Sequence, residues 1–82
     1  MRLAEENRAY NVRVFGSIAR GEATPESDVD LLVSFRENAT ILDAVGLWQE
    51  LQELLARNVS LVGDEDRDTR LMRRIRKDAV TL

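Results

Sequence analysis

The 82-residue chain contains neither cysteine nor histidine. The absence of cysteine excludes a disulfide framework and thiolate metal sites. The absence of histidine removes the commonest general base and the commonest ligand of transition metals. Any metal site or acid–base chemistry must therefore use carboxylates, whose oxygens favour hard cations such as Mg²⁺.

The sequence also lacks a long hydrophobic run. No apolar stretch approaches the roughly 20 residues that span a bilayer, and the polar N-terminus carries no signal-peptide core. We therefore expect a cytoplasmic protein without membrane contact. A composition of 44% hydrophobic and 33% charged residues is that of an ordinary soluble globular protein. So short a chain has room for one core, so we expect a single domain over residues 1–82 that a homo- or hetero-oligomeric contact stabilises.

The net charge of −3 hides two poles of opposite sign. Residues 22–30 contain acids and no base, whereas residues 67–77 contain six bases and one acid. This basic segment is interpreted either as a solvated helix face or as a docking surface for an acidic partner, or for RNA held by that partner. Because no aromatic residues interleave with the bases, we expect no independent binding of nucleic acid.

Hydrophobic periodicity predicts a small α/β (α+β) domain. Strands are expected at 11–15, Val29–Phe35 and 59–62, the last closed by a turn at Gly63. Helices are expected over 40–57 and 67–80, with weak helical character at 2–9 and a short turn for which Ser17 would be the N-cap. The alternating order describes helices packed against a mixed, mostly three-stranded sheet.

Two amphipathic faces are expected to form the core. Thr40 and Asp43 have the spacing of a capping box at the start of the long helix. The apolar stripe of that helix comprises Ile41, Val45, Trp48, Leu51 and Leu55, widened by Leu47 and Leu54. Helical spacing favours a core position for this stripe, including Trp48, over a position at an interface. The last helix would bury Leu71, Met72, Ile75 and Ala79.

Two aspartates, Asp28 and Asp30, stand at the start of the second expected strand. Side chains alternate along a strand, so both carboxylates point to one face, with Cα atoms about 6.6 Å apart. Left uncompensated, the two negative charges would repel each other. Two carboxylates at this spacing can converge on one cation or bridge two, so the pair predicts a Mg²⁺ site.

Gly16 and Ser17 supply the complementary half of such a site. Glycine allows the backbone to approach a ligand closely, and N–H groups that open a helical turn bind anions. The Ser17 hydroxyl adds a donor, and Arg20 is close enough along the turn to assist a phosphate. Each feature alone has a structural interpretation as a turn, cap or solvated strand edge. Together they predict a metal–nucleotide site, for which the matching chemistry is phosphoryl or nucleotidyl transfer.

The stretch GSIARGEATPESDVDLLV, residues 16–33, resembles the signature of the nucleotidyltransferase superfamily that includes DNA polymerase beta. More closely, it resembles the minimal nucleotidyltransferase (MNT) family. The matching residues are Gly16, Ser17, Ala19, Arg20, Gly21, Ser27, Asp28, Asp30 and Leu31. The similarity continues through VGLWQELQELLARNVSLV to the closing RIRKDAVTL. It implies a nucleotidyltransferase fold in which Gly16 and Ser17 bind nucleotide phosphate, and Asp28 and Asp30 bind Mg²⁺.

The resemblance also implies a partner and a reaction. MNT proteins are commonly paired with a HEPN-domain ribonuclease as a toxin–antitoxin system. In these systems the MNT protein is the antitoxin, and it transfers AMP from ATP to a tyrosine of the toxin.

The chain departs from the family pattern at Ser60. The family carries a third catalytic carboxylate on the next strand, in a V-D-L-V-like segment, where this chain has Val59-Ser60-Leu61-Val62. A neutral serine is a weak metal ligand and no base at neutral pH. Asp64 has the correct strand parity, but it would lie about 13 Å further along and beyond the turn expected at Gly63. The substitution fits a natural loss of activity, an engineered inactive variant, or a site completed from elsewhere.

Three functions fit these residues. The first is an enzyme that transfers AMP from Mg²⁺-ATP to a protein hydroxyl, using Asp28, Asp30 and Ser17. The second is an antitoxin that neutralises its ribonuclease by binding alone, with impaired catalysis. The third is a docking module whose partner affinity responds to nucleotide.

Overall fold

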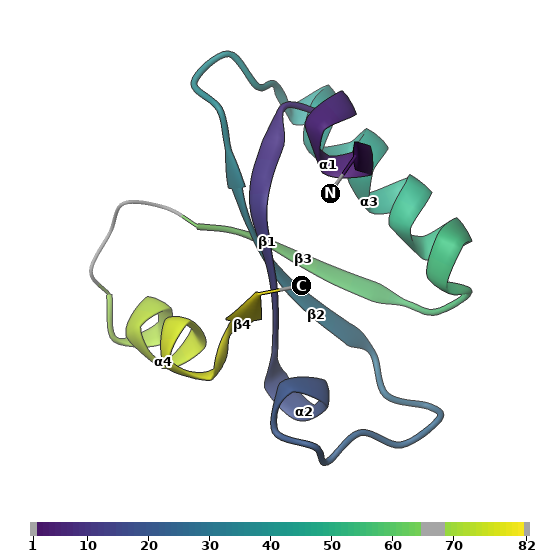
Figure 1. Cartoon of the computed structure of the whole chain (residues 1–82), viewed down its shortest axis with the longest axis vertical. Helices are drawn as coiled ribbons and strands as arrows, with labels where there is room; N and C mark the ends of the chain where they lie inside the picture. Colours follow the sequence, from purple (N-terminus) through teal and green to yellow (C-terminus); the bar gives the residue numbers. More distant parts are fainter. Residues whose placement is uncertain (1, 65–68, 82) are drawn as a thin grey trace.

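The computed structural model describes residues 2–64 and 69–81. The elements, in chain order, are α1 (Arg2–Glu6), β1 (Ala9–Phe15), α2 (Gly16–Ala19), β2 (Val29–Phe35), α3 (Ile41–Leu55), β3 (Val59–Gly63), α4 (Arg70–Asp78) and β4 (Val80–Thr81). The strands form one sheet in the order β3-β2-β1-β4 (Figure 1). The expected α/β architecture is confirmed, with a fourth strand added to the three that were expected.

The fourth strand replaces the last turn of the helix expected over 67–80. α4 ends at Asp78, and Ala79 is extended, with φ −69° and ψ 133°. Val80 and Thr81 then pair antiparallel with Val14 and Arg13 of β1. Pairing with β1 satisfies backbone groups that a frayed helix end would leave to water. Residues 67 and 68 of the expected helix lie outside the described residues.

The central strands have mixed directions. β1 is antiparallel to β2, whereas β2 is parallel to β3. β1 begins at Ala9, two residues earlier than expected, because an irregularity between Tyr10 and Arg13 lets the chain continue pairing. Asn11 lies at this irregularity with φ 51°. Such a bulge re-phases the alternation, so the sequence pattern showed only the second half of the strand.

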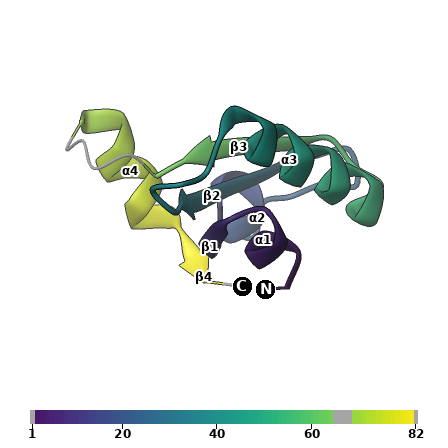
Figure 2. The same ribbon diagram turned by 90° about the horizontal axis from the view of Figure 1, so that it is seen from above.

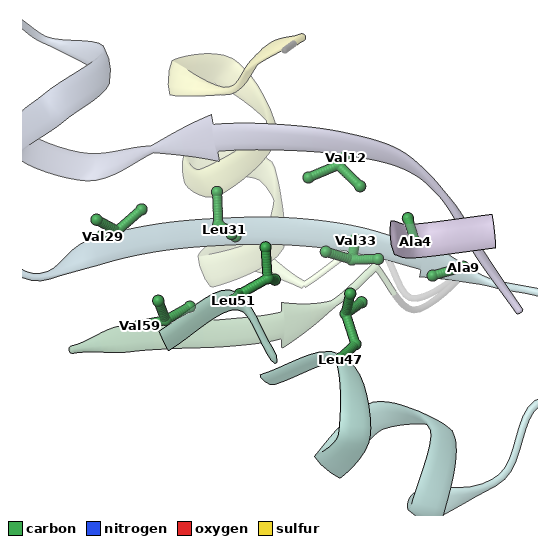
Figure 3. Packing of buried hydrophobic residues seen from close by; sticks show 9 residues of the cluster. All are labelled: Ala4, Ala9, Val12, Val29, Leu31, Val33, Leu47, Leu51 and Val59. Carbon is green, nitrogen blue, oxygen red and sulfur yellow. The ribbon is translucent and has the colours of Figure 1, made fainter. Parts of the chain in front are cut away.

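The two faces of the sheet are covered by different helices. On one face, α1 and α3 cover a core formed by Ala4, Ala9, Val12, Val29, Leu31, Val33, Leu47, Leu51 and Val59 (Figure 3). On the other face, α4 packs Met72 and Ile75 against Leu32. Figure 2 shows α4 on the opposite side of the strands from α3. Asp30 and Leu32 alternate with Leu31, so Asp30 belongs to the face that α4 covers only in part.

The start of α3 confirms the expected capping box. The backbone N–H of Asp43 donates to the Thr40 hydroxyl at 3.3 Å, and the backbone N–H of Thr40 donates to the Asp43 carboxylate at 2.8 Å. The helix ends where Ala56 adopts a left-handed conformation with φ 53°. The cap and this turn fix how α3 leads into β3.

The core position expected for the whole apolar stripe of α3 is wrong. Only Leu47 and Leu51 are buried in this helix. The other members of the stripe are exposed, namely Ile41, Val45, Trp48, Leu54 and Leu55. β3 is an edge strand of the sheet, and α3 packs against the core through Leu47 and Leu51. Trp48 is 38% exposed and donates from its indole Nε1 to the carbonyl of Val59 at 2.7 Å.

Leu71 on α4 was also expected in the core and is exposed. No helix among the described residues is long and apolar enough to cross a membrane.

Candidate functional site

Asp30 and Ser60 lie side by side on neighbouring strands. In the parallel pairing of β2 with β3, Asp30 is the register partner of Ser60, and on its other side Asp30 pairs with Phe15 of β1. Register partners on adjacent strands are about 4.8 Å apart and project to the same face. The position that the family fills with a third acid therefore adjoins Asp30, and here it holds a hydroxyl.

The pKa of the Asp30 carboxylate is raised above its ordinary value. Partial burial raises its pKa, the negative charge of Asp28 raises it further, and Arg20 lowers it only in part. Asp28 lies one residue before β2 and is exposed, whereas Asp30 is the second residue of the strand, so the strand spacing expected for the pair does not hold at Asp28. Two adjacent carboxylates suit Mg²⁺, which proteins usually hold through one or two carboxylates together with phosphate oxygens. Within residues 2–64 and 69–81, no group of three or more acidic side chains is placed to hold a metal.

Gly16 brings backbone directly against Asp30. Its φ is +73°, a conformation that L-residues rarely adopt. A Cβ atom added at Gly16 would overlap Oδ2 of Asp30 and lie 3.2 Å from its Cγ. Glycine is therefore required for both its backbone conformation and its lack of a side chain. The peptide that opens α2 adjoins the Asp30 carboxylate only because no side chain separates them.

The prediction that Ser17 caps this short helix is wrong. The N-cap is Phe15, which makes no side-chain cap, and Ser17 is the second residue of α2. With Gly16 at positive φ, the helix begins two residues earlier than it would with Ser17 as the N-cap. The Ser17 carbonyl accepts from the backbone N–H of Glu22 at 2.8 Å, which folds the following turn back onto α2. Its hydroxyl remains beside Gly16 as a donor.

Arg20 forms ion pairs that sequence reasoning missed. Its Nε lies 3.2 Å from the Glu22 carboxylate, and its Nη1 lies 3.1 Å from the carboxylate of Asp78 at the end of α4. The hydrogen bonds to Glu22 and then to Asp78 raise the pKa of the guanidinium. Glu22 was visible as a near neighbour in sequence. Asp78 lies 58 residues away, and no local pattern connects it with Arg20.

The Asp64 carboxylate forms ion pairs with Arg13 and Arg76. Its carboxylate accepts from Arg13 at 2.7 Å and from Arg76 at 2.8 Å, so it links β1, the end of β3 and α4. Burial raises the pKa of Asp64, but the hydrogen bonds from both arginines outweigh it and hold this pKa below its ordinary value. Gly63 ends β3 as expected, but the chain does not turn there, because the N–H of Asp64 still donates to the carbonyl of Val33 at 2.7 Å. Asp64 still does not replace Ser60, since it stands four positions further along and is neutralised.

Asp28 also borders a polar hollow of about 450 Å³. Its lining comes from the loop before β2 and from the end of α3, with Pro25, Glu26, Ser27, Asp28, Gln52, Ala56, Arg57 and Asn58. No sequence pattern predicts this hollow, because it depends on where α3 ends relative to the loop before β2. It leaves room for a ligand next to Asp28, whereas Asp30 does not line it.

Comparison with known proteins agrees with this geometry. The family model described as "Polymerase beta, Nucleotidyltransferase" matches residues 2–82. The chain is 43% identical over 60 residues to the protein adenylyltransferase MntA of Thermococcus cleftensis. The aligned region covers 73% of this chain and 61% of MntA. The chain thus spans less than two thirds of the length of MntA.

Solved structures share the fold. A candidate minimal nucleotidyltransferase superposes with a TM-score of 0.87 at 42% identity, covering 99% of this chain and 83% of the other. More distant is a toxin–antitoxin complex crystallised with AMP-PNP, with a TM-score of 0.79 at 23% identity over 98% of this chain and 66% of the other. A Shewanella oneidensis complex of a tri-AMPylated HEPN toxin with its MNT antitoxin superposes with a TM-score of 0.69 at 21% identity. This match covers 98% of this chain and 62% of the other. The last two likenesses concern the fold alone.

The family model covers nearly the whole chain, and the residues that carry the signature converge at one end of β2. The chain belongs to the polymerase beta family of nucleotidyltransferases, as one of its minimal members.

Proposed function

We propose that this chain is an antitoxin of the protein adenylyltransferase type, which binds Mg²⁺-ATP and transfers AMP to a hydroxyl of a partner protein. The observation that carries the proposal is the Asp30 carboxylate, which lies against the backbone of Gly16 and is affected by the negative charge of Asp28. Carboxylates that can bind a cation and backbone N–H groups that can bind a phosphate lie within one strand–turn–strand unit. Nucleotidyl transfer needs both elements at one place.

The residues take separate roles in this proposal. Asp28 and Asp30 hold Mg²⁺, which when bound neutralises phosphate charge and orients the triphosphate. The peptide of Gly16 and the hydroxyl of Ser17 donate to phosphate oxygens. Arg20 supplies a guanidinium whose planar fork suits phosphate.

The partner we propose is a HEPN-type ribonuclease toxin, with a tyrosine as the acceptor. The support is the similarity to MntA and the shared fold with the MNT antitoxin that was solved with an AMPylated HEPN toxin. The exposed apolar side chains of α3, among them Ile41 and Val45, are consistent with a chain that works in a complex.

Ser60 favours a second candidate, in which the chain neutralises the toxin by binding and catalysis is residual. The hydroxyl beside Asp30 cannot take a proton from the acceptor at neutral pH. The neighbouring acid, Asp64, is committed to two arginines. Under this alternative, nucleotide binding and toxin binding persist while AMP transfer is slow or absent.

The first test is calorimetric titration of Mg²⁺-ATP into the chain. Because Asp28 and Asp30 supply the carboxylates of the site, we expect the double variant Asp28→Asn, Asp30→Asn to lose at least about tenfold in affinity, the order expected for one charged contact. Labelled AMP supplied with the co-purified partner then reports transfer. Label in the partner with the unaltered chain, and none with the double variant, supports the enzyme.

The control is Glu50→Gln, which removes one negative charge from the exposed surface of α3 and should leave ATP affinity unchanged. Equal ATP affinity in the unaltered chain and the double variant would contradict the proposed site. Partner binding that survives in the double variant, without label in either protein, would favour neutralisation by binding alone.

Gly16→Ala is expected to weaken both the fold and the nucleotide site. The positive φ alone costs about 1–2 kcal/mol for a residue with a side chain, and the new methyl must displace the Asp30 carboxylate. Chemical denaturation and the ATP titration measure the two effects. We expect lower stability together with a loss of ATP affinity.

Gly21→Ala is the matched control for this change. Gly21 has the same φ of +73°, but a Cβ atom there meets nothing within 4 Å. It should show the cost in stability and keep ATP affinity. If the two alanine variants bound ATP equally well, the close approach of Gly16 to Asp30 would have no role in the site.

A further inference from the structure

We propose that Asp78 is a positioning residue, which holds the guanidinium of Arg20 in place for the nucleotide phosphates. This inference rests on the proposed function. It assigns a part in ATP binding to the C-terminal end of α4, which lies far in sequence from the signature of residues 16–33.

The guanidinium of Arg20 donates hydrogen bonds to two carboxylates. The Glu22 carboxylate lies 3.2 Å from its Nε, and the Asp78 carboxylate lies 3.1 Å from its Nη1. A guanidinium carries five N–H donors in a rigid plane, so these two contacts leave further donors on the same group. Arg20 is the C-cap of α2, a four-residue helix whose first residue, Gly16, lies against the Asp30 carboxylate.

Asp78 is itself held firmly. It is the last residue of α4, and two residues later Val80 pairs with Val14 of β1, close to the start of α2. Upstream, Arg76 is bound to Asp64 at 2.8 Å. The buried side chains of α4 pack against β2 between the two ends of the helix. The carboxylate of Asp78 is therefore presented from a fixed support.

Glu22 alone would be a weaker support. It lies in the segment between α2 and β2, where all residues from Arg20 to Glu26 are exposed. A long arginine side chain in such a loop loses much rotamer freedom when a ligand orders it. Contact with Asp78 imposes that order before the nucleotide arrives, and preorganisation of this kind strengthens binding.

The charge of Asp78 acts in the opposite direction. A carboxylate near a triphosphate repels it, so removing the charge would by itself tighten ATP binding. Positioning through Arg20 and direct repulsion therefore predict opposite signs. This difference makes the two effects separable by experiment.

The experiment is a double-mutant cycle on ATP affinity, with Asp78→Asn, Arg20→Gln and the double variant titrated with Mg²⁺-ATP. In the chain with Arg20, we expect Asp78→Asn to weaken binding about fivefold to tenfold, the usual size of coupling between contacting residues. In the Arg20→Gln background, the same change should leave affinity unchanged or slightly tighter. A structural role for Asp78 would not depend on residue 20 in this way.

Two further variants complete the design. Asp78→Glu keeps the carboxylate and should retain most of the affinity, so a loss confined to Asp78→Asn is assigned to the charge and not to an altered side chain at position 78. Glu50→Gln controls for net charge. The proposal is overturned if Asp78→Asn tightens ATP binding, leaves it unchanged in the chain with Arg20, or has the same effect in both backgrounds.

The outcome separates this inference from the proposed function. If the unaltered chain binds Mg²⁺-ATP through Asp28 and Asp30 while Asp78→Asn changes nothing, only the role of Asp78 is wrong. If the unaltered chain does not bind Mg²⁺-ATP, both the proposed function and this inference are wrong.

Discussion

Replacing Ser60 with aspartate is expected to raise the rate of AMP transfer by a factor of about 10²–10⁴, the range over which general-base help acts. The register places residue 60 directly beside Asp30 on the same face of the sheet, so a carboxylate there would join the pair. It would add a ligand for the cation and a base for the acceptor hydroxyl. Single-turnover transfer of labelled AMP to the partner protein measures the change.

Ser60→Asn is the matched control, because asparagine has nearly the shape of aspartate without its charge. It should transfer AMP no faster than the unaltered chain, and both variants should bind the partner equally. A Ser60→Asp variant as slow as Ser60→Asn would show that the missing acid does not limit this site. Ser60 is exposed, so neither substitution disturbs the core.

Asp64→Asn is expected to lower the free energy of unfolding by about 2–3 kcal/mol, the scale of hydrogen bonds to charged groups. The Asp64 and Arg13 side chains are only 16% and 14% exposed, so the change leaves the guanidinium of Arg13 facing a neutral amide with little water. For a domain of this size, the melting temperature should fall by roughly 10–20 °C. Thermal and chemical denaturation measure both quantities, with Glu50→Gln as the control.

The same carboxylate gives a pH signature. Because the pKa of Asp64 is lower in the folded chain than in the unfolded one, the unfolded state takes up this proton first as the pH falls. The stabilisation is complete above the unfolded pKa and is lost as the pH falls through the folded pKa. Asp64→Asn should therefore flatten the acid limb of the stability curve. An unchanged acid limb would mean that Asp64 does not carry this linkage.

Much of the site was predictable because its signals are local. The strand Val29–Phe35 and the Thr40–Asp43 cap depend on residues a few positions apart, and both predictions are confirmed. Strand spacing does not describe Asp28, which lies one residue before β2. The close approach of Gly16 to Asp30 also goes beyond spacing, because it depends on the antiparallel register of Phe15 with Asp30.

The errors concern features that only the assembled chain decides. Trp48 has the helical spacing of a core residue, but the sheet is too narrow at β3 to cover it. Val80 lies within the helix expected over 67–80, yet its backbone pairs with Val14 of β1. The contact of Arg20 with Asp78 and the two arginines on Asp64 join residues far apart in sequence. Spacing along the chain holds no information on such partners.

The half-exposed indole of Trp48 gives the protein a built-in optical signal. It is the only tryptophan in the chain, so its emission needs no correction for others. Its Nε1 is bonded to the carbonyl of Val59, the residue that precedes Ser60. Movement of β3, or a partner that covers α3, will change the water around the ring and shift its fluorescence. Events beside the carboxylate pair can thus be followed in the unlabelled protein.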